Sequence, residues 1–213
     1  MEAFIRANTV LASASIVPEI TLHLATEETP LWHLTEERLK GNDPLPPPYW
    51  AFAWPGGQGL ARYVLDHPEE IRGKRVFDFA AGCGIAAIAA AKAGAKMALA
   101  DDIDRLAQTS ILMNAKQNGV SIKIQPVMDM EKPVSGVDLI LAGDVFYQQA
   151  MSVQVERWLR LCIGQGVRVL IADPGRAYLP KEGLKELARY DVPTSRELED
   201  RESRTVIVYE MRN

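Results

Sequence analysis

The residues of this sequence that are most suited to binding or catalysis lie around a glycine turn and two acidic positions. Asp78 closes an apolar strand, VFDF, and the chain then passes through Gly82-Cys83-Gly84 into an alanine-rich helix. Glycine lets the backbone turn sharply and approach a ligand closely, and the helix directs its N-terminus at the same space. Asp102, within the acidic group 101–104, closes the next apolar segment. This arrangement predicts a pocket for a nucleotide-like cofactor.

Two cofactors suit this geometry. Taken as G-x-G-x-x-A, the residues Gly82, Gly84 and Ala87 can cradle a dinucleotide pyrophosphate. A pyrophosphate is negative, however, and the Asp78 carboxylate would face it at close range. S-adenosylmethionine instead presents an α-ammonium and a sulfonium there. The acids at the ends of both strands therefore favour S-adenosylmethionine.

The second acidic position has a defined place in this pocket. Asp102 is expected to hold the ribose hydroxyls through charge-assisted hydrogen bonds, with Ile103 against the adenine. Ala80, between Asp78 and the glycines, is assigned to the same pocket. The alternative is that the glycine turn only permits tight packing of strand on helix, which leaves both acids unexplained.

Composition narrows the class of protein. The 213 residues are 47% hydrophobic and 24% charged, which is ordinary globular usage. A net charge of -4 argues against a nucleic-acid binder, because neutralising phosphates needs a basic face. Cys83 and Cys162 form no disulfide or zinc framework, and no metal-ligand spacing appears. Without a membrane-spanning run or a secretory leader, we expect a cytoplasmic protein and a monomer.

The chain divides into two regions of unequal regularity. Residues 1–50 are expected to form an N-terminal extension packed on the core, with a short helix over 4–12 and a strand over 20–24. The proline-rich GNDPLPPPYW, residues 41–50, is expected to be a stiff extended connector, because proline cannot lie inside a helix or central strand. Residues 51–213 are predicted to be the catalytic domain.

Strands and helices alternate through this domain. Strands are predicted at residues 75–79, 96–100, 122–127, 137–142 and 167–172, and helices at residues 59–67, 84–93, 104–118 and 150–162. Such alternation implies a parallel sheet covered on both faces. A helix is predicted over 181–188, followed by strands over 190–198 and 205–211.

The last two predicted strands break the alternation. Only the charged turn 199–203 joins them, so one of them must lie antiparallel. The predicted fold class is α/β, a Rossmann-like, seven-stranded methyltransferase sheet with helices on both faces and a C-terminal antiparallel hairpin.

From about residue 46 onward the sequence resembles the class I lysine methyltransferases, and within them the electron transfer flavoprotein β-subunit lysine methyltransferase group. The motifs that carry the resemblance are PPPYWAFAWPGGQGLARYVLD, VFDFAAGCGIAAIAAAKAGA, ALADDID, NAKQNG and GDVFY. The tryptophan-proline-glycine element is the most discriminating of these motifs, because it is rarer than a glycine turn.

The resemblance implies roles for several residues. Asp144 and Tyr147 match the D/E-x-x-Y/F signature of lysine-directed enzymes, so Asp144 is expected to orient the lysine and Tyr147 to offer a hydroxyl and an aromatic face. Trp54 is implied as a wall of the cofactor site, with Asp144 also bordering that site. Asp129 is either a contact to the adenine amino group or a plain turn residue. Arg176 is either a substrate contact or part of a solvated loop.

Simpler roles remain open for the two signature residues. Asp144 follows a strand and precedes a helix, where an acid commonly caps free N–H groups. Tyr147 can serve packing alone.

The substrate implied by the resemblance is a protein, the β-subunit of electron transfer flavoprotein. The element Asp144-Val145-Phe146-Tyr147 lacks the two prolines typical of enzymes that methylate planar nitrogens, which favours an sp³ amine. Another protein, such as a ribosomal protein, or a small molecule is the alternative substrate. A non-catalytic scaffold would not need both Asp78 and Asp102, and a dehydrogenase would need nicotinamide binding.

Overall fold

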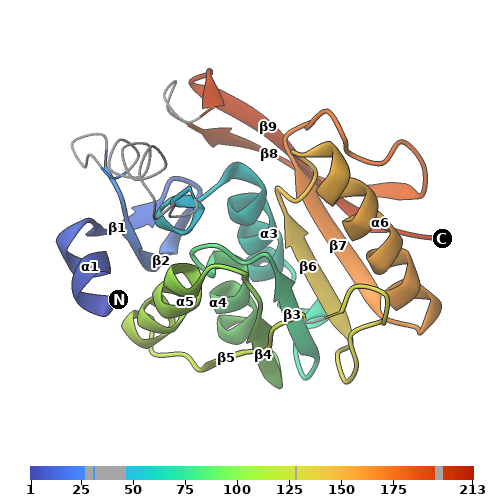
Figure 1. The fold of residues 1–213 in the computed structure, drawn as a ribbon, viewed down its shortest axis with the longest axis horizontal. Helices are drawn as coiled ribbons and strands as arrows, with labels where there is room; N and C mark the ends of the chain where they lie inside the picture. Colours follow the sequence, from blue (N-terminus) through green and yellow to red (C-terminus); the bar gives the residue numbers. More distant parts are fainter. Residues whose placement is uncertain (27–30, 32–46, 128, 195–198) are drawn as a thin grey trace, which may run out of the picture.

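The computed structural model describes residues 1–26, 31, 47–127, 129–194 and 199–213. Its main body is a seven-stranded sheet flanked by helices, with a two-stranded sheet beside it (Figure 1). Within the described ranges no helix combines the length and the apolar character needed to cross a membrane. The same ranges contain no group of three or more His, Cys, Asp or Glu side chains arranged to hold a metal ion.

The large sheet has the strand order β5-β4-β3-β6-β7-β9-β8. Its strands are β3 (Arg75–Phe79), β4 (Met97–Ala100), β5 (Ile122–Ile124), β6 (Leu139–Gly143), β7 (Arg168–Asp173), β8 (Leu184–Pro193) and β9 (Ser203–Met211). Strand β9 is antiparallel to both of its neighbours, β7 and β8, while the pairs from β5 to β7 are parallel. The predicted fold class is confirmed.

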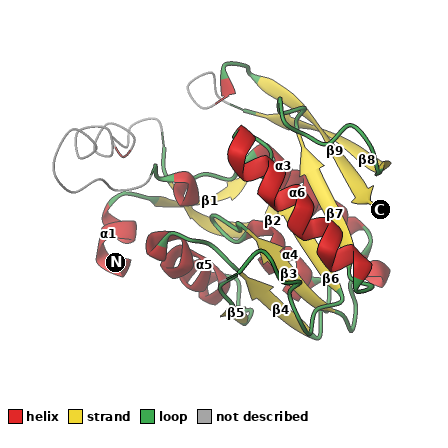
Figure 2. Cartoon of the chain, turned by 45° about the vertical axis from the view of Figure 1, so that its right-hand side comes forward, coloured by secondary structure: helices red, strands yellow, loops and turns green. Residues whose placement is uncertain are grey.

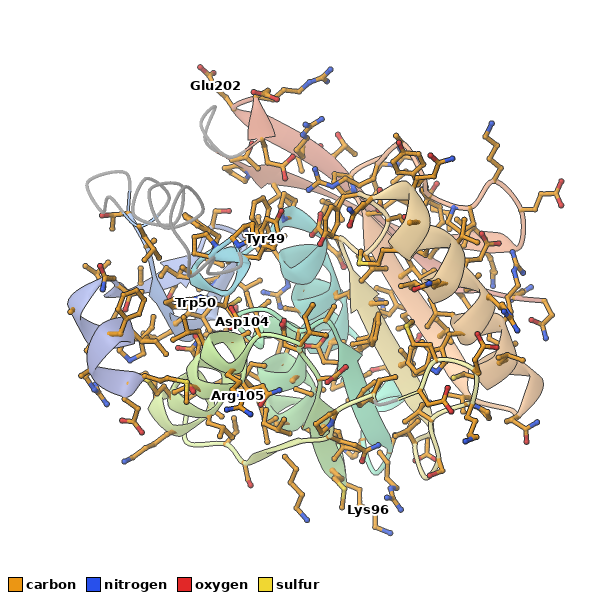
Figure 3. All side chains as sticks on the ribbon, viewed as in Figure 1. Tyr49, Trp50, Lys96, Asp104, Arg105 and Glu202 are labelled. Carbon is orange, nitrogen blue, oxygen red and sulfur yellow. The ribbon has the colours of Figure 1, made fainter. Side chains whose placement is uncertain are left out.

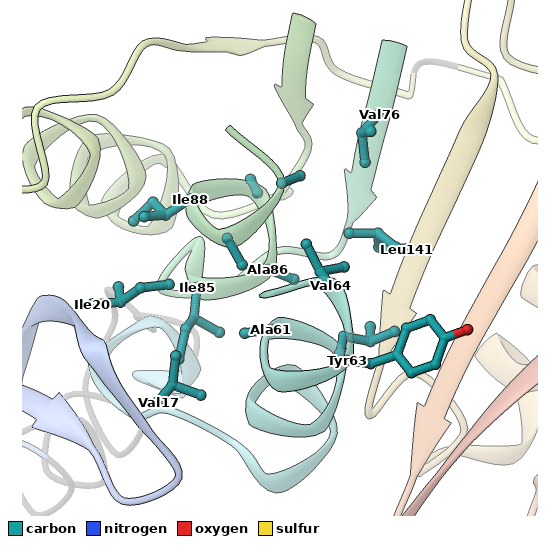
Figure 4. Close-up of a cluster of buried hydrophobic side chains, with 14 of the residues drawn as sticks. Val17, Ile20, Ala61, Tyr63, Val64, Val76, Ile85, Ala86, Ile88 and Leu141 are labelled. Atoms are coloured by element: carbon teal, nitrogen blue, oxygen red, sulfur yellow. The ribbon is translucent and has the colours of Figure 1, made fainter. Parts of the chain in front are cut away.

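Helices cover both faces of this sheet, and Figure 2 shows α6 running over it. The helices are α3 (Pro55–Asp66), α4 (Ile85–Lys92), α5 (Arg105–Gln117) and α6 (Gln149–Gly164), with short 3₁₀ turns η1 (Tyr49–Ala51) and η2 (Pro68–Glu70). Successive strand residues point to opposite faces. Val76 accordingly joins the core under α3 and α4 (Figure 4), whereas Phe77 joins the core under α6.

The N-terminal segment is more regular than expected. It forms α1 (Glu2–Ala7) and an antiparallel hairpin of β1 (Val10–Ala14) and β2 (Val17–Leu24). Val17 and Ile20 pack into the core beside Ile85 (Figure 4). The predicted connector lies outside the described residues up to residue 46, and its last residues lead into η1.

The predicted helix over residues 4–12 is wrong beyond Ala7. The Asn8 side-chain amide donates to the Phe4 carbonyl (2.8 Å), and the Thr9 hydroxyl donates to the Ile5 carbonyl (2.6 Å). These side chains occupy carbonyls of the last helical turn, which favours termination of the helix. The chain then enters β1.

The predicted helix over residues 181–188 is also wrong. Residues from Leu184 onward form β8, which pairs with β9 from Leu184 opposite Met211 to Pro193 opposite Ser203. The segment LKELA is rich in helix formers, but long pairing with β9 outweighs that local preference. The predicted strand over 190–198 is thus the second half of β8, and its residues 195–198 lie outside the described part of the chain.

Glycines let α3 lie directly on the sheet. A Cβ atom at Gly59 would lie 2.6 Å from Cγ1 of Val206 on β9, and one at Gly56 would lie 2.5 Å from the Ala172 carbonyl oxygen on β7. No side chain fits at either position without displacing the helix. Helix α3 begins at Pro55, four residues earlier than predicted, so Gly56 lies in its first turn.

We expect Gly59→Ala to lower the free energy of unfolding by about 1–3 kcal/mol, because the buried, β-branched Val206 cannot yield to the added methyl. Gly164→Ala is the matched control. Gly164 also lies in a helix, but nothing lies within 4 Å of the position of an added Cβ. We expect this variant to gain up to about 1 kcal/mol from helix propensity. Urea unfolding measures both changes, and a Gly59→Ala protein as stable as the parent would contradict the packing argument.

Candidate active site

Four acidic residues gather at one edge of the sheet. Asp78, Asp102, Asp144 and Asp173 stand at or just after the carboxyl ends of β3, β4, β6 and β7. Figure 3 shows the two ends of β4, with Lys96, which precedes the strand, well separated from Asp104, which follows it. The carboxyl edge is where open α/β sheets bind ligands.

The turn between β3 and α4 is held in an unusual backbone conformation. Ala80, Gly82 and Gly84 have φ angles of 52°, 53° and 78°. Glycine adopts positive φ readily, whereas a positive φ strains the backbone at Ala80. Such strain is concentrated at functional sites. Asn114 of α5 supports the turn, since its side-chain amide donates to the Cys83 carbonyl (2.9 Å).

Asp78 lies beneath this turn and is almost completely buried. Its Oδ2 accepts a hydrogen bond from the Ala87 N–H (2.9 Å) in the first turn of α4. Burial raises the pKa of Asp78 to about 7, and the nearby Asp102 adds to this rise. Asp78 is therefore a carboxyl group poised to ionise near neutral pH.

Asp102 closes the turn from the side of β4. Its Oδ2 accepts from the Gly82 N–H (3.0 Å), and its Oδ1 accepts from the Asp104 N–H (2.9 Å). Burial raises the pKa of Asp102. Within the described residues, no Lys or Arg lies within ion-pair distance of Asp78 or Asp102. Two poorly solvated carboxyl groups without a cation form a site suited to a positively charged ligand.

Asp144 lies at the end of β6 and reaches the start of α3. Its φ angle is 56°, a left-handed conformation that Asp tolerates better than most residues. Its Oδ2 accepts from the Gly56 N–H (2.5 Å), and its Oδ1 accepts from the Arg176 guanidinium (2.9 Å). Asp144 thus caps α3, which lies earlier in the chain, rather than the helix that follows it.

Arg176 belongs to a wider set of charges and is not part of a solvated loop. Besides Asp144 it binds Glu199, at 2.5 Å from Oε1 and 3.2 Å from Oε2. Glu199 also accepts from Arg204 Nε (3.0 Å). Asp173 accepts the Arg176 backbone N–H (2.6 Å), and burial raises the pKa of Asp173 to about 6.

Aromatic side chains form a row that ends at Tyr147, three residues after Asp144. The Tyr49 ring lies 5.7 Å from Trp54 and 5.8 Å from Tyr147, in edge-to-face geometry, and Trp54 also meets Phe52 at 5.9 Å. The Trp54 indole donates to the Tyr49 carbonyl (2.8 Å). Tyr49 and Tyr147 are exposed. The row gives the site an apolar wall that remains open to solvent.

Two residues of the predicted cofactor site stand apart from these contacts. The side chain of Ile103 is 97% exposed, so it contacts little within the chain. Asp129 accepts from the Glu131 N–H (2.9 Å) and pairs with Lys132 (3.0 Å), which are the contacts of a turn residue. Their roles toward adenine stay predictions.

The sequence did not point to three residues that the structure adds. Tyr49 precedes the tryptophan-proline-glycine element by several positions, and its aromatic type next to that motif is the one available signal. Glu199 acts through contacts between distant segments, so it carries no local signal. Asn114 opens the NAKQNG motif, but its bond to the Cys83 carbonyl joins distant segments and was not predicted.

Comparison with known proteins begins with a family model. The model described as "Ribosomal protein L11 methyltransferase (PrmA)" matches residues 63–145. An electron transfer flavoprotein beta subunit lysine methyltransferase from Rattus norvegicus is 39% identical over 202 residues, covering 91% of this chain and 77% of the relative. Its counterpart from Danio rerio is 40% identical over 200 residues, covering 90% and 76%.

Among solved structures, a magnesium protoporphyrin IX methyltransferase from Synechocystis PCC 6803 with bound SAH has a TM-score of 0.52. The superposition covers 85% of this chain and 94% of that one, at 15% identity. A likeness at such low identity shows a shared fold alone. It agrees with the strand order described above.

Asp78 gives a testable dependence of stability on pH. The folded pKa of about 7 lies above the ordinary 3.8, so between pH 4 and 7 the folded state retains a proton that the unfolded state loses. The parent therefore loses stability relative to Asp78→Asn as pH rises through this window, by at most about 1.4 kcal/mol per pH unit. Urea unfolding at pH 5 to 8 measures the difference, with equal m values as the control. A difference that stays constant with pH would contradict this assignment.

Proposed function

The chain belongs to the electron transfer flavoprotein beta subunit lysine methyltransferase family, and from that premise we propose that this protein-lysine methyltransferase uses S-adenosyl-L-methionine to methylate the electron transfer flavoprotein β-subunit. The observation that carries the proposal is the meeting of a cation-seeking carboxylate pair, Asp78 and Asp102, with the Asp144-Tyr147 signature at one sheet edge. The expected cytoplasmic location and monomeric state stay predictions.

The two carboxyl groups around the glycine turn fit S-adenosyl-L-methionine. Asp78 and Asp102 have raised pKa values and no cationic partner within the described part of the chain, so a positive ligand would relieve their desolvation. When bound, this cofactor supplies a methyl group activated by a sulfonium. Asp78 is then the counter-charge for the amino-acid portion, and Asp102 accepts the ribose hydroxyls. The positive φ angles of Ala80, Gly82 and Gly84 form the tight turn between these two carboxyl groups.

Asp144 and Tyr147 act on the other reactant. A lysine is almost wholly protonated at pH 7 when free, with a pKa near 10.4. Asp144 attracts and orients the incoming ammonium, and its side chain is 11% exposed, which leaves a face for that contact. The aromatic row of Tyr49, Trp54 and Tyr147 desolvates the amine, which favours its neutral, nucleophilic form. The released proton passes to water.

A methyltransferase for another protein or a small molecule is the alternative function. The similarity to ribosomal protein L11 methyltransferases supports it only in part, because the matched residues 63–145 hold the glycine turn and Asp102 but end before Tyr147. The match therefore bears on the cofactor rather than on the substrate.

The first test concerns the cofactor. Asp102→Asn is expected to weaken the binding of S-adenosylhomocysteine at least about tenfold, because losing a charged hydrogen-bond partner costs about 1.5–3 kcal/mol. Asp104→Asn is the matched control, since Asp104 caps α5 through the Leu106 N–H (2.8 Å) and Asn caps as well as Asp. Calorimetric titration measures both affinities. Equal losses in the two variants would remove the ribose role of Asp102.

The second test concerns the transferred group. Purified electron transfer flavoprotein is incubated with radiolabelled S-adenosylmethionine and either the parent or Asp144→Asn. This substitution keeps an acceptor for the Gly56 N–H and tolerates the left-handed backbone, but it removes the charge. We expect label in the β-subunit with the parent and at least about a tenfold lower rate with the variant.

The outcomes of this assay separate the hypotheses. Label that appears in another protein of a cell extract, but not in the β-subunit, would move the substrate to the alternative function. Full transfer by a folded Asp144→Asn protein would contradict the role assigned to Asp144. If the parent does not bind the cofactor, the proposal that the protein is a methyltransferase is contradicted.

A further inference from the structure

Arg176 joins carboxylates from two distant parts of the chain. Its guanidinium binds Asp144 at the end of β6 and Glu199 in the segment between β8 and β9. Glu199 is almost completely buried, and it holds Arg204 as well as Arg176. An arginine suits this bridge better than a lysine, because its planar guanidinium holds several N–H donors in a rigid arrangement that can bind two carboxylates at once.

The contacts of Asp144 fix the direction of its carboxylate. Its backbone N–H donates to the Ala172 carbonyl (3.1 Å), Gly56 donates to one carboxylate oxygen and Arg176 to the other. Each carboxylate oxygen can accept more than one hydrogen bond. Asp144 can therefore hold a substrate ammonium without releasing either donor.

We propose that Arg176 is a positioning residue for Asp144, anchored by Glu199, and that it keeps this carboxylate ionised and aimed at the lysine amine. The inference rests on the proposed function where it concerns the amine, whereas the effect of Arg176 on Asp144 does not depend on the substrate.

The charges around Asp144 come from three elements. Arg176 and Asp173 face it from the end of β7, and Glu199 faces it from the segment between β8 and β9. Helix α3 presents the Gly56 N–H. Burial raises the pKa of Asp144, Glu199 raises it further, and Arg176 lowers it. Arg176 is thus the one positive side chain among these groups, and its charge opposes the protonation that burial favours.

The test is the pH profile of methyl transfer by Arg176→Gln. The active form carries ionised Asp144, so activity falls as pH drops through the pKa of this group. Without the guanidinium that pKa rises, and we expect the acidic limb of kcat/KM to move to higher pH by about 1–3 units. Glu199 also pairs with Arg204 (3.0 Å in the parent), so it keeps one cationic partner in this variant, which supports folding. Arg176→Lys restores a positive charge and is expected to return the limb toward that of the parent.

Arg62→Gln is the matched control. Arg62 also bridges two carboxylates, Glu19 and Asp66, and its side chain is 20% exposed, against 21% for Arg176. A purely structural effect of losing such a bridge would appear in both variants. We expect the acidic limb of Arg62→Gln to coincide with that of the parent. A limb that moves equally in Arg62→Gln and Arg176→Gln would overturn the proposal.

A second readout needs no substrate. Carbon-13 NMR of aspartate carboxyl groups, with Asp144→Asn to assign the signal, follows the titration of Asp144 directly in the parent and in Arg176→Gln. An increase in the pKa of Asp144 supports the proposal, and an unchanged pKa overturns it whatever the substrate. If the pKa of Asp144 rises in Arg176→Gln while the parent transfers no methyl group to the flavoprotein, the positioning role stands and the proposed function is contradicted.

Discussion

The desolvation of carboxyl groups at one edge of the sheet is the constraint on which the site depends. Burial makes ionisation of Asp78 and Asp102 costly, and within the described residues no ion pair relieves that cost. Backbone N–H groups of Ala87 and Gly82 compensate only in part. The fold thus holds a site that is incomplete until a cation arrives. This is a stronger argument for the nature of the ligand than the glycine turn alone, because such turns also serve plain packing.

Asp144 differs from Asp78 and Asp102 because it has a cationic partner within the chain. It is also mostly shielded from solvent, but it accepts hydrogen bonds from Gly56, at the N-terminus of α3, and from Arg176. The close seating of α3 on β7, which the glycines permit, is what brings that N-terminus within reach. Packing and electrostatics are therefore inseparable here, since moving α3 outward would break the hydrogen bond that orients the carboxylate. The segment holding Glu199 is linked to the same point, so the C-terminal hairpin takes part in shaping the site.

Much of the fold could be predicted from the sequence because its core strands are short apolar runs separated by clear helix signals. The turn from Asp78 to Gly84 and the acidic end of β4 were found for the same reason, as their chemistry is local. The first half of β8 was wrongly predicted as a helix, because pairing with a strand that comes later in the chain outweighs its helix-forming residues. The hydrogen bond between Arg176 and Asp144 joins residues that follow two different strands, β7 and β6, so no spacing rule reveals it. The role of Asp144 as a cap for an earlier helix was missed for this reason too.

The position of β9 in the sheet also affects the rate of folding. Strand β9 follows β8 in the chain, yet it lies between β7 and β8. During folding, the edge of β7 stays unpaired until a strand more than two dozen residues later inserts beside it, and such non-local pairing is slow. An apolar strand with an open edge is prone to pair with other chains. The arrangement that delivers Glu199 to the site therefore exposes the nascent chain to aggregation, and an early hairpin of β8 and β9 that docks as a unit would shorten that interval.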